Sequence, residues 1–438
     1  MTKKADSPLF LVYSGYPIMQ TILYILFGLL LLTPVTGELF RIPVFGFDLL
    51  PSDLIILALL VVWIYDKFHN DRVLRVGRLG RAVTLFWAVL LVTFLFNGFR
   101  ADWHEMISAG AYLARYTVYL TLPLIAYDLL EREAKRRFSK LLFGALVAAM
   151  LLICILGFLQ LIFFPNFLDL GMDVWGWDPH IGRLVSTWLD PNYVGGFLAF
   201  ALSVLFAVAL SFRQKRDRRM FWILAGAGAI GFFALYLTYS RSALLTFLVS
   251  VGILSFLKSR KLLAAVLILL LLGFGLSARV RERTADAWDS GKAFLGLDSQ
   301  RPLDPTAQLR VRSWENAVEI IGDHPFIGIG YNRYKAEYNR RGFGLLSDHA
   351  SGGSDSSLLT IWATSGFVGL LSFLWIGFMA VVVALRRSWK KADLRSYIDA
   401  GLLAGFGGMM IHSIFVNSLL YPLIMVYLLV GVGVMDEK

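Results

Sequence analysis

Long apolar runs alternate with short polar segments along most of the 438-residue chain. A run of about twenty residues is the length that an α-helix needs to cross a bilayer, whereas a membrane β-barrel shows alternating segments of roughly ten residues. The apolar runs lie at 15–34, 52–66, 82–98, 108–127, 141–164, 193–212, 221–239, 242–257, 262–277, 356–385, 397–414 and 418–434. This pattern predicts an all-α membrane protein, a polytopic bundle of about 12 transmembrane helices.

One polar stretch, 278–355, interrupts the series of apolar runs. It carries eleven Lys and Arg and eleven Asp and Glu, so it cannot lie in lipid. Residues 310–321 and 331–341 have helical spacing, and the stretch ends in a glycine-rich loop. The sequence therefore predicts three parts: 1–277 with transmembrane helices 1–9, 278–355 as a large helical loop or cap, and 356–438 with transmembrane helices 10–12.

The composition also indicates a membrane protein. Hydrophobic residues make up 57% of the chain and charged residues 17%, and the mean hydropathy is +0.65. Such a chain has too little polar surface to cover a soluble globule of this size. The lone Cys154 lies in an apolar run and excludes an intrachain disulfide. Residues 18–32 are expected to remain as a first helix, because no small-residue cleavage pattern follows them.

Basic residues are distributed unevenly between the loops. Alternate short loops are rich in Lys and Arg, namely 67–81, 132–140, 213–219, 258–261 and 386–395. By the positive-inside rule these loops and both termini are cytoplasmic, and the long polar stretch is extracytoplasmic. The net charge of +11 then follows mainly from topology, and the scattering of the basic clusters argues against a nucleic-acid interface.

Among the arginines expected on the extracytoplasmic side, five are candidate ligands for a phosphate-bearing substrate: Arg115, Arg183, Arg241, Arg310 and Arg312. A guanidinium presents forked donors that match phosphate oxygens. Arg115 lies within a span, where a charge costs roughly 2.5–3.5 kcal/mol, so it needs a partner or a wet cavity. The alternative interpretation is snorkelling or an ion pair with an outer Asp.

Two residues near the end of the polar stretch are candidates for a general base. Asp355 follows the glycine-rich loop and opens a helix, so its carboxylate is either a base or a helix cap. His349 is the competing base, whereas His324 before Pro325 is interpreted as structural. The sequence contains no Asp-x-Asp pair, paired-cysteine site or nucleotide-binding loop, so neither a metal nor a cofactor is expected.

Several short motifs follow one another in a characteristic order. Thr238–Leu245 reads Thr-Tyr-Ser-Arg-Ser-Ala-Leu-Leu, Arg310–Trp314 fits Arg-x-x-x-Trp, and 324–330 reads His-Pro-Phe-Ile-Gly-Ile-Gly. Residues 364–369 read Thr-Ser-Gly-Phe-Val-Gly, and Leu189–Gly196 reads Leu-Asp-Pro-Asn-Tyr-Val-Gly-Gly, in which the Asp is expected to cap the next helix. With these motifs and its layout, the chain resembles the O-antigen ligase and O-antigen polymerase superfamily.

The resemblance implies a metal-independent membrane glycosyltransferase of the GT-C type in the bacterial inner membrane, with its active site facing the periplasm. The donor would be a glycan on undecaprenyl pyrophosphate, and the acceptor a hydroxyl of the lipid A core or of a second lipid-linked glycan. Arginines of the family bind the pyrophosphate, and by motif these correspond to Arg241 and to one or both of Arg310 and Arg312. Fixed cations would stabilise the leaving group without a metal.

The chain departs from the family at one position. Ligases of the family usually carry a histidine in a His-Asn-x-x-Leu context, whereas this sequence has Asp355 in Asp-Ser-Ser-Leu-Leu. Either Asp355 acts as the base, or His349 reaches in from the loop. The departure leaves a polymerase as an alternative to a ligase in lipopolysaccharide biosynthesis. A twelve-helix transporter is the alternative from another class, although the sequence has no two matching halves.

Overall fold

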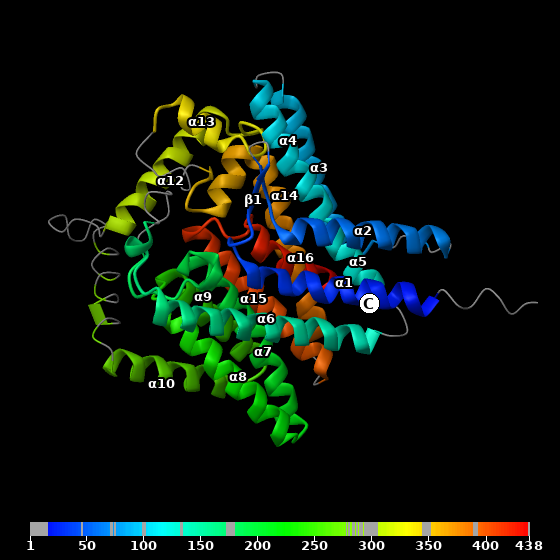
Figure 1. The fold of residues 1–438 in the computed structure, drawn as a ribbon, viewed down its shortest axis with the longest axis vertical. Coiled ribbons are helices and arrows are strands. Elements are labelled where there is room, and N and C mark those ends of the chain that lie inside the picture. Colours follow the sequence, from blue (N-terminus) through cyan, green and yellow to red (C-terminus); the bar gives the residue numbers. More distant parts are fainter. Residues whose placement is uncertain are drawn as a thin grey trace, which may run out of the picture.

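The computed structural model describes residues 16–44, 47–70, 76–98, 102–131, 135–171, 180–276, 305–343, 352–388 and 393–436, with a few isolated positions besides. Most of this chain forms a bundle of long helices (Figure 1). They are α1 (Tyr16–Leu32), α2 (Pro51–His69), α3 (Arg78–Gly98), α4 (Trp103–Tyr119), α5 (Thr121–Leu130), α6 (Lys135–Phe163), α7 (Pro191–Gln214), α8 (Arg218–Leu237), α9 (Arg241–Leu257), α10 (Arg260–Leu276), α14 (Ser357–Ser388), α15 (Leu394–Phe415) and α16 (Pro422–Asp436).

Smaller elements lie between the long helices. Two helices belong to the predicted cap, α12 (Pro305–Asp323) and α13 (Tyr334–Arg340). Three turns are 3₁₀-helical: η1 (Thr33–Thr36), η2 (Phe167–Leu170) and η3 (Ser186–Trp188). An antiparallel hairpin, β1 (Ile42–Val44) with β2 (Phe47–Leu49), precedes α2 and was not expected from the helical pattern. Its β-branched and aromatic residues favour strands, and Pro43 disfavours a helix there.

Each predicted apolar run is occupied by a helix, and the run at 108–127 is divided between α4 and α5 at Leu120. Seven of the described helices are long and apolar enough to cross a membrane: α1 with η1, α3, α6, α7, α8, α14 and α15. Helices α9 and α16 are apolar but shorter. These elements agree with the predicted all-α membrane protein. The count of twelve spans and the placement of the long loop outside the membrane stay predictions.

Helices α7, α9 and α15 pack closely at the centre of the bundle. Glycines on α15 allow the approach, since a Cβ at Gly401 would lie 2.9 Å from the Cα of Val204 on α7. A Cβ at Gly408 would lie 2.7 Å from the backbone oxygen of Thr246 on α9. Small residues at such contacts let backbones of membrane helices come close together, so larger side chains here would push the three helices apart.

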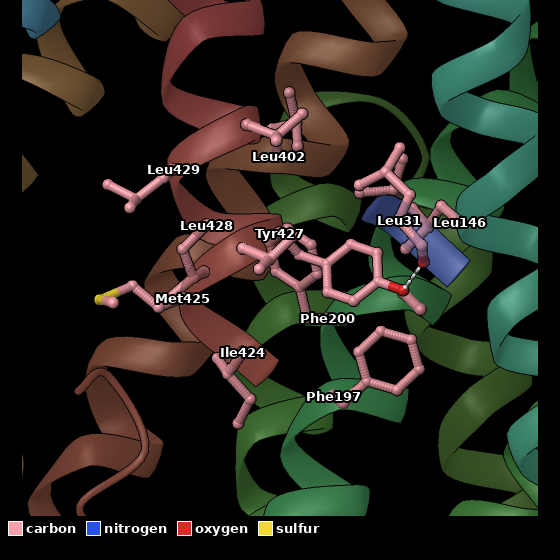
Figure 2. Packing of buried hydrophobic residues seen from close by; sticks show 14 of the residues in the cluster. Leu31, Leu146, Phe197, Phe200, Leu402, Ile424, Met425, Tyr427, Leu428 and Leu429 are labelled. Carbon is pink, nitrogen blue, oxygen red and sulfur yellow. Dashed lines mark hydrogen bonds between the residues drawn. The ribbon is translucent and has the colours of Figure 1, made fainter. Parts of the chain in front are cut away.

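The C-terminal helix α16 joins this core. Figure 2 shows Tyr427 among buried hydrophobic side chains that come from distant parts of the chain. Its ring centroid lies 4.9 Å from that of Phe197 on α7. Its hydroxyl donates to the backbone carbonyl of Leu31 on α1, so the polar atom of this buried side chain is satisfied. Met425, on the same helix, lines the cavity described below.

A kink in α14 holds the cap. At Gly366 the backbone has φ +68°, which breaks the helical hydrogen-bond pattern. The carbonyls of Ala363 and Thr364 instead accept the N–H groups of Ile329 and Gly330, each at 2.9 Å. The His-Pro-Phe-Ile-Gly-Ile-Gly and Thr-Ser-Gly-Phe-Val-Gly motifs therefore form one structural unit that joins the α12–α13 turn to α14.

Arg333 fixes the cap to a second part of the bundle. Its Nη1 donates to the backbone oxygen of Asn97 at 3.0 Å, and its Nη2 forms an ion pair with Glu105 at 2.9 Å. Asn97 belongs to α3 and Glu105 to α4, whose junction lies at the same end of the bundle as α12 and α13 (Figure 1). The cap therefore contacts both α14 and the α3–α4 junction.

Candidate functional site

A cavity of about 510 Å³ is lined in part by residues of the cap helices α12 and α13. Its walls come from the segment before α2, from α4, α12 and α16, and from the first turns of α7 and α14. The volume is within the range of roughly 300–1,000 Å³ that is usual for ligand sites. The charged residues on its walls are Glu38, Arg41, Asp48, Arg115, Asp190, Arg310 and Asp355.

Helix α12 brings Arg310 and Asp355 to the same cavity. Ser313 follows Arg310 by three positions, so the two side chains lie on one face of the helix. The Ser313 hydroxyl accepts the backbone N–H of Asp355 at 2.9 Å. The indole N–H of Trp314 points to the Asp355 carbonyl at 3.4 Å. Two of the predicted site residues, an arginine and a carboxylate 45 positions apart, thus line one space.

Serines and a threonine satisfy the backbone at the start of α14. Ser356 Oγ accepts the N–H of Leu359 at 3.4 Å, and Thr360 Oγ1 accepts the N–H of Ser354 at 2.9 Å. Ser357 Oγ accepts the N–H of Leu419 at 3.1 Å, which bonds this helix end to the α15–α16 turn. Helix capping is therefore supplied by hydroxyls next to the Asp355 carboxylate.

Arg241 begins α9 beside the cavity wall but is not among the residues that line the cavity. The preceding Ser240 caps α9 by accepting the N–H of Ala243 at 3.3 Å. The Ser240 hydroxyl also donates to Oδ1 of Asn192 at 2.7 Å, and Asn192 does line the cavity. The motif around Arg241 is thus bonded to the cavity wall through its serine.

Arg115 lines the cavity with its charge matched by a carboxylate. Its Nε and Nη2 donate to the two oxygens of Asp53 at 2.9 and 2.7 Å. Its Nη2 also donates to the backbone oxygen of Asp48, and its guanidinium carbon lies 4.1 Å from the ring centroid of Phe47. The ion pair with an outer Asp that the sequence left open for Arg115 is therefore present.

The remaining predicted residues lie elsewhere. Arg183 donates from Nε to the backbone oxygen of Thr238 at 2.9 Å and is not among the lining residues. Arg312 is exposed on another face of α12 and does not line the cavity either. His349 belongs to a segment, 344–351, that lies outside the described residues.

Other residues that line the cavity were not singled out from the sequence. Glu38 and Arg41 pair at 3.3 Å, Arg41 pairs with Asp48, and the hydroxyl of Tyr421 donates to Glu38. Asp190, expected as a helix cap, accepts the N–H groups of Asn192 and Tyr193 at 2.6 and 3.1 Å. The signal available was that the segment 35–51, between two apolar runs, carries three charged residues, and these line the cavity.

Tyrosines form much of the remaining wall. Burial raises the pKa of Tyr334 in the cap, and the nearby Tyr338 and Asp355 raise it further. Burial also raises the pKa of Tyr331, and Tyr112 acts in the same direction. Both phenols therefore stay protonated at neutral pH and can donate a hydrogen bond to a ligand, but they are unsuited to act as bases.

Comparison with known proteins identifies the central part of the chain. No curated protein matches the chain. Residues 226–374 match the family model described as O-antigen ligase. The matched segment contains Arg241, Arg310, Arg312 and Asp355, together with the interlocked motifs of the cap and α14. Over this segment the match confirms the resemblance of the chain to the O-antigen ligase and polymerase superfamily.

Proposed function

We propose that the protein transfers a glycan from undecaprenyl pyrophosphate to an acceptor hydroxyl at the periplasmic face of the bacterial inner membrane. The observation that carries the proposal is the convergence of Arg310 and Asp355 on one cavity within the family-matched segment. The first supplies a fixed positive charge for a diphosphate, and the second supplies a carboxylate that can accept a proton.

The reaction balances with groups on this chain and the two substrates. The acceptor hydroxyl gives its proton to the Asp355 carboxylate, and its oxygen forms a bond to the anomeric carbon of the donor sugar. The bond between that carbon and the diphosphate oxygen breaks, and its electron pair stays on the diphosphate. Arg310 stabilises the departing charge, a contribution worth about 10²–10³ in rate for one donor at a comparable site.

The other predicted arginines differ in how directly they could contact the diphosphate. Arg241 opens a helix next to Asn192 on the cavity wall and is the second candidate to contact the diphosphate. Arg115 reaches the cavity with its charge already paired to Asp53. Arg183 and Arg312 do not line the cavity and would need a rearrangement of the protein to contact the donor.

The acceptor that we propose is the lipid A core, which makes the protein an O-antigen ligase of lipopolysaccharide biosynthesis. A polymerase, with a second lipid-linked glycan as acceptor, is the second candidate because an aspartate occupies the position where ligases of the family usually carry histidine. The two reactions share the donor, the leaving group and the base, so the same cavity serves both. Neither requires a metal ion in this scheme, since fixed guanidinium groups stabilise the leaving diphosphate.

Reconstitution tests the proposal directly. Purified protein in lipid nanodiscs is given a lipid-linked glycan and either lipid A core or a second lipid-linked glycan, and the products are separated by electrophoresis and mass. We expect product with one acceptor, loss of product in Arg310→Gln and Arg241→Gln, and normal product in Asp323→Asn, which changes an exposed carboxylate at the other end of α12. Absence of product with both acceptors would contradict the proposal.

A further inference from the structure

One wall of the cavity is a chain of ion pairs joined by a hydrogen bond to the backbone, which we call the hairpin wall: Glu38, Arg41, Asp48, Asp53 and Arg115. Arg41 joins Glu38 to Asp48, and Arg115 joins the Asp48 backbone to Asp53. The members come from the segment around β1 and β2, from α2 and from α4, so the wall depends on tertiary structure. All except Asp53 line the cavity.

The charge of the hairpin wall does not suit a diphosphate. Glu38, Asp48 and Asp53 contribute three carboxylates, whereas Arg41 and Arg115 contribute two guanidiniums, which leaves one excess negative charge. A diphosphate at this wall would lie next to carboxylates that repel it, in a partly buried site where charges are weakly screened. Arg310 is the cavity-lining arginine that lies outside this wall, so the negative leaving group is expected at the Arg310 side of the cavity.

The wall does suit a ligand that carries many hydroxyl groups. Ion pairing fixes the carboxylates in place, yet each carboxylate oxygen can accept more than one hydrogen bond. Nη1 of Arg115 makes no hydrogen bond to any described residue, although the side chain is only 6% exposed. The wall thus offers carboxylate oxygens as acceptors and Nη1 of Arg115 as a donor, which can satisfy hydroxyl groups that both donate and accept.

Aromatic rings adjoin these polar groups. Tyr112, Tyr116 and Tyr331 line the cavity, and the rings of Tyr116 and Tyr331 lie 6.0 Å apart. On the other side, Tyr421 bonds to Glu38 and packs on Tyr193 with ring centroids 4.3 Å apart. Flat apolar surfaces beside fixed polar groups match a sugar ring, which has C–H groups on its faces and hydroxyls on its rim.

We infer that the hairpin wall is a sugar-binding subsite, which holds a pyranose ring of the glycan while the diphosphate is held at the Arg310 side. The inference rests on the proposed function, because it divides that cavity between two chemically different parts of the substrates. The ring belongs either to the donor glycan or to the acceptor glycan, and both have the same recognition chemistry.

Binding measurements with separate probes test the division. Titration calorimetry on purified protein uses inorganic pyrophosphate as one probe, and uses neutral oligosaccharides released by mild acid from the donor and from the acceptor as the others. Glu38→Gln keeps one oxygen to accept the Tyr421 hydroxyl, and replaces the oxygen that pairs with Arg41 by an NH2 group, so the charge and the ion pair are lost. We expect it to weaken binding of one oligosaccharide about tenfold or more, as loss of a charged hydrogen-bond partner does, and to leave pyrophosphate binding within about twofold.

Three further variants complete the design. Arg310→Gln is expected to weaken pyrophosphate binding and to leave the oligosaccharide unaffected. Tyr421→Phe keeps the ring that packs on Tyr193 and removes the hydroxyl, so it gives a second measurement if Glu38→Gln fails to fold. Glu319→Gln is the matched control, because it makes the same chemical change on the exposed face of α12, where 60% of the side chain is exposed to solvent. It should change the binding of neither pyrophosphate nor the oligosaccharides.

The results separate the two ideas. Unchanged oligosaccharide binding in both Glu38→Gln and Tyr421→Phe, equal weakening of both probes, or no oligosaccharide binding to the unaltered protein would overturn the sugar subsite. Oligosaccharide binding that depends on Glu38, with no binding of pyrophosphate at all, would keep the subsite and count against the proposed transfer reaction. The oligosaccharide whose binding is weakened by Glu38→Gln or Tyr421→Phe shows whether the bound ring belongs to the donor or to the acceptor.

Discussion

Ser313 on α12 accepts a hydrogen bond from the backbone N–H of Asp355 at 2.9 Å. The bond joins a cap helix to Asp355, two residues before the start of α14, across 42 positions of sequence. Because Arg310 lies one turn before Ser313, the same helix positions a cation and holds a carboxylate in the cavity. The relative position of the Arg310 guanidinium and the Asp355 carboxylate therefore depends on how α12 packs against the start of α14.

Replacing Ser313 tests this dependence. In Ser313→Ala the Asp355 N–H loses its acceptor at a buried position, a cost of about 1–3 kcal/mol. We expect kcat to fall roughly tenfold to a hundredfold in proportion to that cost, while the Kd for pyrophosphate stays within about twofold. Ser313→Thr keeps the hydroxyl and should restore most of the rate. An equal loss of pyrophosphate binding would show that the serine supports the whole cap and has no separate effect on Asp355.

A second prediction concerns the kink in α14. Gly366 has φ +68° and ψ −176°, a conformation that is essentially restricted to glycine, and a Cβ there would lie 2.1 Å from the Phe326 backbone oxygen. Gly366→Ala is therefore expected to cost about 2–5 kcal/mol, from strain and overlap together. Gly377→Ala is the matched control on the same helix, because a Cβ at that position meets nothing within 4 Å. Thermal unfolding followed by circular dichroism should show a lower midpoint for the first variant only.

The positions of the helices could be predicted because the apolar runs are long, and length is the physical requirement for crossing a membrane. The motif at 364–369 was recognised from its residues, and the structure shows its structural role in the bonds from Ile329 and Gly330 to α14. The helix positions depend on local sequence, and the kink depends on one close contact between the motifs at 324–330 and 364–369. A single sequence carries that information in residue type and spacing.

The hairpin wall could not be predicted in the same way. Glu38, Arg41 and Asp48 stand in a short segment with no periodicity, and their partners Tyr421 and Arg115 are distant in the chain. A charge in a loop is usually solvated, so the three charges in this segment did not by themselves indicate a binding site. Only the tertiary arrangement shows that they line the cavity with Asp355.

The two arginines of α12 give a third prediction. Arg310 lines the cavity, whereas Arg312, two residues further along the helix, is exposed on another face. Arg310→Gln should lower kcat/KM for glycan transfer by about 10²–10³, and Arg312→Gln by less than about fivefold. Initial rates with each variant at several donor concentrations measure both parameters. A larger effect of Arg312 would mean that α12 presents its other face to the donor, and the assigned cavity would then be wrong.

The choice of general base gives the last prediction. Asp355→Asn keeps the size of the side chain and the N–H bonded to Ser313 but removes the proton acceptor, so kcat should fall about 10²–10⁴-fold with little change in donor binding. Added formate, a small carboxylate, should restore part of that rate if the loss is chemical. His349→Ala should leave the rate within a few-fold, and Asp323→Asn controls for loss of a carboxylate at an exposed position. If His349→Ala instead abolishes transfer and Asp355→Asn does not, the histidine acts from the loop, and the aspartate in place of the family's usual histidine has another role.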